Sequence, residues 1–211
     1  MGSTSVCLAE TARAETMTIR FKQCALTTFS CLGLIWAVSL AALTSEDVLL
    51  QLALIPRSTD GLIGVLTMPL VHYSLPHLMV NTAPLTVMTV IIAMRGFGYY
   101  LTATLSIVLL GGLLVWLFAR TGAHVGASGL LFGYFGFLLV RGLFDRRISS
   151  IVIAIVIGFL YGGIIWGVLP REGAISWEAH LFGLLAGAVV ARAMARFPTA
   201  ATNRSGQPIK N

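Results

Sequence analysis

The segment Tyr99–Phe118, YYLTATLSIVLLGGLLVWLF, has twenty residues without a single charged side chain, and it decides the fold class. About 20 predominantly apolar residues are what an α-helix needs to cross the hydrocarbon core of a bilayer. The whole chain is 57% hydrophobic and only 10% charged, whereas a soluble domain carries about 25% charged residues. We therefore predict a membrane protein, and a soluble single domain is excluded.

Five further apolar runs of spanning length flank this one. The predicted fold class is all-α, a polytopic membrane helix bundle with six transmembrane helices, which cover Cys24–Thr44, Pro76–Met94, Tyr99–Phe118, Ala127–Phe144, Ile148–Leu169 and Trp177–Ala195. The first run lacks a small-residue cleavage site, so we interpret it as a retained span and not as a signal peptide. Residues 1–23 and 197–211 are predicted to be short cytoplasmic tails around a core at 24–196.

The segment between the first two spans is ambiguous. Val48–Ile55 and Leu62–Leu75 are apolar, but each is too short to cross a bilayer. Irregular backbone at membrane depth is tolerated only where protein or water covers it. We therefore expect a long loop in or on the membrane interface that packs against the bundle.

The charges predict the orientation of the chain. A formal charge of +6 and a pI near 9.7 would suit a nucleic-acid partner, but no basic face with interleaved aromatics is present. With six spans, eleven Lys and Arg residues fall on the side of both termini, and three, Arg57, Arg120 and Arg171, fall on the other. The positive-inside rule then places both termini in the cytoplasm. The expected surroundings are a lipid bilayer, without nucleic acid.

Strongly polar residues inside such a bundle cost several kcal/mol unless they find partners, so their positions are informative. His77 and Asn81 lie in the second span, Ser128 opens the fourth, and His180 lies near the start of the sixth. These three spans all begin on the non-cytoplasmic side. The four side chains are therefore predicted to share the outer half of the bundle.

Ser128 stands in the sequence Gly126-Ala127-Ser128-Gly129, followed by Gly133. One interpretation is structural, because Ser and a small-xxx-small pair such as Gly129 and Gly133 pack membrane helices closely. The other is a nucleophile at a helix start, where small neighbours leave room for a substrate and backbone N–H groups face the reaction centre.

His180 is followed by Gly183 and Gly187, and the three residues share one helical face. If this face meets Gly129 and Gly133, the Ser128 hydroxyl and the imidazole come within hydrogen-bond reach. Histidine is the usual base that activates a serine near neutral pH. A proton relay, or a histidine that simply satisfies its hydrogen bonds in the bundle, stays an alternative.

The spacing of His77 and Asn81 puts both side chains on one face of the second span. Such donors can stabilise the negative charge that develops on a carbonyl oxygen during acyl transfer. The alternative is an interhelical hydrogen-bonding pair, worth about 1 kcal/mol. Glu178 is two residues before His180 and points to a different face, so a Ser–His dyad is the simpler inference.

Together these residues resemble the rhomboid family of intramembrane serine proteases. The resemblance covers roughly Cys24–Arg196 and rests on His77-x-x-x-Asn81, Gly126-x-Ser128-Gly129 and His180-x-x-Gly183-x-x-x-Gly187, with His72 fitting a further family histidine. Order, span assignment and depth make the set specific, although each motif alone is weak.

The resemblance implies Ser128 as nucleophile and His180 as general base. It also implies an oxyanion site formed by His77, Asn81 and the backbone N–H of Ser128. The expected substrates are single-span transmembrane proteins cut in or near the membrane, and no metal or cofactor is implied. The expected location is a bacterial plasma membrane, with the site open to the outer face.

Two positions depart from the family pattern. Many members have Tyr where this chain has Phe132, four residues after the serine, and this loses the hydroxyl but keeps the stacking surface. The first loop often carries a Trp-Arg pair, and here it has Arg57 and no Trp. Two other functions remain alternatives: a catalytically silent relative that binds membrane clients, and a small transporter that uses the same polar residues.

Overall fold

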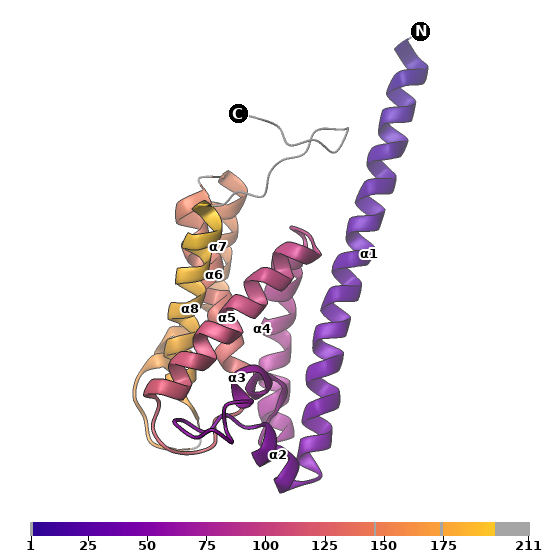
Figure 1. Cartoon of the computed structure of the whole chain (residues 1–211). Helices are drawn as coiled ribbons and strands as arrows, with labels where there is room; N and C mark the ends of the chain where they lie inside the picture. The colour runs from indigo at the N-terminus through magenta and orange to yellow at the C-terminus, as the bar shows by residue number, and fades with distance from the viewer. Residues whose placement is uncertain (1, 146, 174, 197–211) are drawn as a thin grey trace.

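The computed structural model describes residues 2–145, 147–173 and 175–196. Within these ranges the chain is helical, without a β-strand, and Figure 1 shows the arrangement of its helices. The elements are α1 (Gly2–Leu43), α2 (Glu46–Leu52), α3 (Gly64–Thr67), the 3-10 helix η1 (Met68–Leu70), α4 (Leu75–Ala93), α5 (Phe97–Phe118), α6 (Ser128–Asp145), α7 (Ile148–Tyr161), the 3-10 helix η2 (Gly162–Val168) and α8 (Trp177–Arg196).

Six segments of the described chain are long and apolar enough to cross a membrane, which confirms the predicted all-α bundle. They are Glu15–Leu43, Leu75–Ala93, Phe97–Phe118, Ser128–Asp145, Ile148–Val168 and Trp177–Ala195. The fifth span was predicted as one apolar run, and the structure divides it into α7 and η2.

The segment expected as an N-terminal tail, residues 1–23, is helical from Gly2 onward. It continues without a break into the first span, as α1 runs from Gly2 to Leu43. The physical reason is local: no Gly or Pro occurs between Gly2 and Gly33 to end the helix. The expected C-terminal tail at 197–211 lies outside the described residues.

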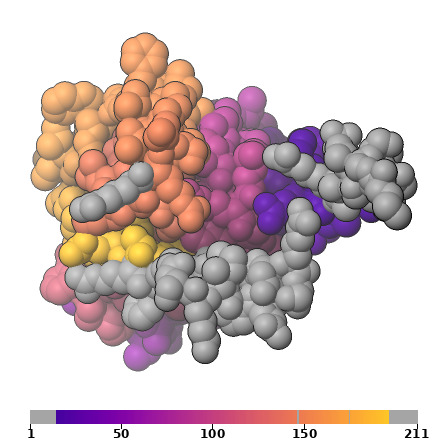
Figure 2. All heavy atoms as spheres, turned by 90° about the horizontal axis from the view of Figure 1, so that it is seen from above, coloured from indigo at the N-terminus to yellow at the C-terminus, as the bar shows by residue number. Residues whose placement is uncertain are grey.

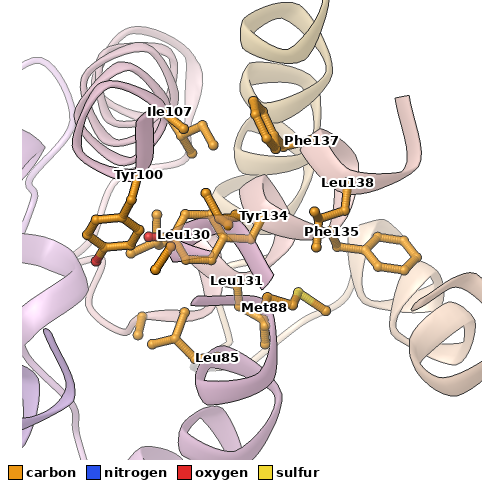
Figure 3. Close-up of a cluster of buried hydrophobic side chains, with 14 of the residues drawn as sticks. Leu85, Met88, Tyr100, Ile107, Leu130, Leu131, Tyr134, Phe135, Phe137 and Leu138 are labelled. Atoms are coloured by element: carbon orange, nitrogen blue, oxygen red, sulfur yellow. The ribbon is translucent and has the colours of Figure 1, made fainter. Parts of the chain in front are cut away.

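Helix α6 forms the centre of the bundle. Figure 3 shows its side chains between Leu85 and Met88 of α4 and Tyr100 and Ile107 of α5. The aromatic side chains that α6 buries most completely are Tyr134, Phe135 and Phe137. A helix buried on this many sides holds its first residue, Ser128, in a fixed place.

Helices α6 and α8 approach each other through glycine. A Cβ atom added to Gly183 would overlap the carbonyl oxygen of Gly129, and one added to Gly187 would overlap that of Gly133. The glycine faces of α6 and α8 therefore lie against each other. Because the two backbones are in such close contact, the position of α8 relative to α6 is fixed.

The segment between α1 and α4 folds against the bundle, as expected. Leu54, Val65 and Met68 of this loop form a buried cluster with Val115 and Ala119 at the end of α5, and with Ala179 of α8. The short helices α2 and α3 and the 3-10 helix η1 provide hydrogen bonds for part of the backbone of this loop. The loop is a packed part of the molecule on the side where α6 and α8 begin (Figure 1).

Arg57 anchors this loop although the loop contains no Trp. Its Nη1 donates to the carbonyl of Ala119 at 2.7 Å, beside the C-terminus of α5. Trp116 of α5 supplies the aromatic partner, because its Nε1 donates to the carbonyl of Ser58 at 2.9 Å. Arg57 and Trp116 together thus join the first loop to α5.

The outer helices lie on different sides of the centre. Viewed from the end of the bundle in Figure 2, α1 (indigo) and α7 (orange) lie apart, with α4 between them. Helix α7 buries only Ser150 and Ile157, and η2 buries no residue. This side of the bundle faces the surrounding lipid.

Candidate active site

Ser128 is the first residue of α6, and Gly126 decides where the helix starts. Gly126 has φ = +120°, a conformation that side-chain-bearing residues rarely adopt, and this turns the chain sharply into the helix. The first N–H groups of a helix lack intrahelical partners. The hydroxyl of Ser128 and free backbone donors therefore meet at one point.

The first outer loop forms hydrogen bonds with the backbone segment that precedes Ser128. Leu54 and His124 exchange two backbone hydrogen bonds, of 3.0 and 2.8 Å. The N–H of Gly126 donates to the carbonyl of Met68 at 3.0 Å. The N–H of Ala127 donates to Nε2 of His72 at 3.1 Å. The position of Ser128 thus depends on a loop some 55 residues earlier in the chain.

His72 is a fully buried link between three elements. Since its Nε2 accepts from Ala127, the neutral ring carries its proton on Nδ1, which donates to Ser39 Oγ of α1 at 2.8 Å. The Ser39 hydroxyl in turn donates to the carbonyl of Leu70 at 2.7 Å. Burial, and then the neighbouring His77, lower the pKa of His72 to about 4. The ring therefore stays neutral and keeps its acceptor.

His180 lies one turn into α8 and is buried. Ser176 caps this helix, because its Oγ accepts from the N–H of Ala179 at 3.1 Å. Nε2 of His180 lies 2.9 Å from Oγ of Ser128. Phe132, one turn after Ser128, stacks on the imidazole with a centroid distance of 4.2 Å and an interplanar angle of 4°.

The second ring nitrogen of His180 fixes the tautomer. Nδ1 lies 2.9 Å from the carbonyl oxygen of Gly167 in η2, and a carbonyl only accepts. The neutral ring must therefore carry its proton on Nδ1 and present the lone pair of Nε2 to Ser128. This is the tautomer that can take a proton from the serine hydroxyl.

His77 and Asn81 lie beside this pair on α4. A Cβ atom on Gly126 would be 2.8 Å from Cε1 of His77 and 3.7 Å from Oγ of Ser128, so both side chains border the same glycine. Among the described residues, the ring nitrogens of His77 have no hydrogen-bond partner. Asn81 donates from Nδ2 to the carbonyl of His77 at 2.9 Å, and among the described residues it forms no hydrogen bond with Ser128.

Sequence reasoning missed His124, which lies four residues before Ser128. Its Nε2–H donates to the carbonyl of Arg120 at 3.0 Å, and its Nδ1 accepts from the hydroxyl of Ser176 at 2.6 Å. Burial, the largest influence, lowers the pKa of His124. The side chain ties the end of α5 to the cap of α8. The only sequence signal was its short distance from the serine motif.

Arg120 and Glu178 reinforce the same corner. Arg120 Nε lies 3.3 Å from the buried Glu178 carboxylate, and the guanidinium also donates to carbonyls of the loop before α8. Glu178 therefore turns away from His180, as its spacing predicted. Within the described residues, no group of three or more His, Cys, Asp or Glu side chains is placed to hold a metal ion.

Comparison with known proteins gives a consistent result. The Rhomboid domain family matches residues 59–197, which include all the side chains described above except Ser39, Leu54 and Arg57. An uncharacterized protein of Mycobacterium tuberculosis is 44% identical over 168 residues, which cover 72% of this chain and 70% of that protein. One of Mycobacterium leprae is 40% identical over 142 residues, covering 63% and 56% respectively. The chain is an integral, multi-pass membrane protein, and it belongs to the rhomboid family.

Proposed function

We propose that this chain is an intramembrane serine protease that cleaves transmembrane proteins in or near the bilayer. The observation that carries the proposal is the 2.9 Å contact between Nε2 of His180 and Oγ of Ser128. Three features support it: the tautomer set by Gly167, the stacked Phe132, and the close glycine contact of α6 and α8. A serine that served only helix packing would need none of them.

In the proposed reaction, Ser128 attacks the carbonyl carbon of the scissile peptide bond. His180 takes the hydroxyl proton on Nε2 and gives it to the departing amine. The acyl-enzyme is then hydrolysed by a water that His180 activates in the same way. The mechanism uses two side chains, since the nearby Glu178 is bound to Arg120.

The negative charge of the tetrahedral intermediate needs donors. The backbone N–H of Ser128 and the ring of His77 are the candidates that border the reaction centre. Asn81, one turn further along α4, retains a second N–H after its bond to the His77 carbonyl. The removal of one such donor typically costs about 3 kcal/mol in transition-state stabilisation.

The proposed substrates are single-span membrane proteins that enter laterally between α4 and α7. Large apolar side chains are exposed on both helices, among them Val80 of α4 and Phe159 of α7. The orientation proposed from the charge distribution has both termini in the cytoplasm and the site near the outer face. Water would then reach the serine from outside.

Cleavage of a model single-span substrate by the purified chain in detergent tests this proposal. The wild type and Ser106→Ala, a serine of α5 outside the site, are expected to release product. Ser128→Ala and His180→Ala are expected to lose at least 10³-fold in rate, as do other serine hydrolases without these groups. Full cleavage by Ser128→Ala would refute the mechanism.

A silent, client-binding relative would give a different result. The folded wild type would then retain the single-span protein without cutting it, and the Ser128→Ala variant would retain it equally well. No described side chain favours this outcome, because the serine and the histidine are both present and in contact.

A further inference from the structure

The imidazole of His180 bridges two elements through its two nitrogens. Nε2 contacts Ser128 of α6, and Nδ1 contacts the backbone carbonyl of Gly167 in η2, each at 2.9 Å. In a serine hydrolase with a triad, an acidic side chain occupies the second position. Among the described residues, no carboxylate forms a hydrogen bond with this imidazole.

We propose that the carbonyl of Gly167 acts as the third member of the site and positions the base; this rests on the proposed function. A fixed acceptor keeps the proton on Nδ1 and holds the plane of the ring toward Ser128. Its oxygen also carries a partial negative charge, which stabilises the imidazolium that forms when Nε2 takes the serine proton. Gly167 is thus a positioning residue that acts through His180.

A side chain at this position would displace the two rings of the site. A Cβ atom on Gly167 would lie 2.8 Å from Cζ of Phe132 and 3.1 Å from Nδ1 of His180. The first distance is shorter than real Cβ contacts, so a side chain would force the Phe132 ring, the His180 ring or the η2 backbone to shift. By contrast, a Cβ on Gly162 or Gly163 of the same 3-10 helix would meet nothing within 4 Å. The requirement for glycine is therefore specific to the residue that faces the imidazole.

The element that carries this carbonyl is weakly held. No residue of η2 is buried, and α7, which precedes it, buries only Ser150 and Ile157. An outward movement of η2 would take the Gly167 oxygen away from Nδ1 and leave the ring free to turn. The orientation of the base is therefore coupled to the position of η2, the segment beside the proposed entry of substrate.

The rate of Ser128 modification by a fluorophosphonate probe tests this role without a known substrate. Replacing Val168 by its α-hydroxy acid turns the Gly167 carbonyl from amide to ester, a poorer acceptor, and adds no atom. We expect the maximal rate of modification to fall about tenfold with unchanged half-saturation, as one neutral hydrogen bond is weakened. The matched control replaces Ile164 by its α-hydroxy acid and is expected to react within twofold of wild type.

Gly167→Ala is expected to lower the same maximal rate about 100-fold, because the ring is displaced. Gly163→Ala is the control and is expected to match the wild type. If both the Val168 ester and Gly167→Ala reacted at the wild-type rate while Ser128→Ala stayed unlabelled, the role of Gly167 would be wrong and the protease proposal would stand. If the wild type itself were not labelled at Ser128, both would fall.

Discussion

The consecutive spans α6 and α7 differ in how hydrophobicity relates to burial, and in a soluble protein this relation would be the reverse. The span formed by α7 and η2 is the more apolar of the two, yet 11% of it is buried inside the protein, against 67% of the α6 span. In a bilayer, apolar side chains gain little by leaving lipid, so close packing selects small residues and shape. The more apolar of these two spans is the one more exposed to lipid, and the four glycines of α6 are all buried.

This difference separates two tasks of the site. Ser128 stands on the most enclosed helix, whose backbone is in contact with α8 and whose start is held by the first loop. Gly167, whose carbonyl is the proposed positioning group for His180, lies on the span with the smallest buried share. The proposed nucleophile is thus on a buried helix, and the group proposed to position its base is on a span exposed to lipid.

The largest expected effect is at the glycine contact of α6 and α8. Gly183→Leu should lower the free energy of unfolding by about 3 kcal/mol or more, because the side chain overlaps the backbone of Gly129. Gly162→Leu, where a Cβ meets nothing within 4 Å, should change it by less than about 1 kcal/mol. Unfolding titrations in mixed micelles measure both. Equal losses would contradict the contrast between the two spans.

Two phenylalanines test the same contrast between buried α6 and exposed α7, with a smaller expected effect. Phe135 of α6 is 2% exposed and Phe159 of α7 is 88% exposed. Phe135→Ala should cost about 2.5 kcal/mol, mainly from the cavity that is left, since transfer from water plays no part. Phe159→Ala should cost less than about 0.5 kcal/mol. A large loss at Phe159 would indicate a protein partner on that face.

The anchoring of α6 by the first loop should depend on pH through His72. The ordinary pKa of 6.5 falls to about 4 in the folded protein, so its contribution to stability is present above pH 6.5 and is lost as the pH falls toward 4. Between pH 7 and pH 5 the free energy of unfolding should drop by about 2 kcal/mol. His72→Gln keeps an acceptor for Ala127 without titrating, so it should show a smaller drop. The same slope in both proteins would exclude His72 as the cause.

Phe132 should have the smallest effect of the four. Phe132→Ala removes the ring stacked on His180 and should reduce the rate of the proposed cleavage about tenfold, with the fold intact. Phe132→Tyr keeps the stacking surface and should stay within twofold of wild type. Rates of substrate cleavage, compared at equal amounts of folded protein, provide the measurement. A large loss in the Tyr variant would show that the pocket excludes a hydroxyl.

The sequence predicted those features that depend on composition and spacing. Apolar runs gave the six spans, and the repeated glycines after Ser128 and His180 predicted where α6 and α8 meet. The positions of Ser128, His180 and His77 within their spans predicted that these side chains lie in the same half of the bundle. These inferences succeed because membrane helices have a fixed length and glycine has a narrow set of uses in them.

Other features could not be predicted because they depend on backbone atoms or on distant loops. The carbonyl of Gly167 leaves no mark in the side-chain pattern, and His124 forms its bonds to Arg120 and Ser176 only in the folded loop. Helix α1 extends beyond the apolar run that predicted the first span, because its polar N-terminal part also lacks helix-breaking residues. The bond from Trp116 of α5 to the first loop likewise forms only in the folded chain.

The measurement that tests the central claim most directly is the site of covalent modification by a fluorophosphonate. The purified wild type would be treated with the probe, digested, and analysed by mass spectrometry, alongside Ser128→Ala and His180→Ala. The account predicts that the wild type carries the phosphonyl group on Ser128 and that both variants, still folded, remain unmodified. A folded wild type without label on Ser128, or label that persists in His180→Ala, would contradict it.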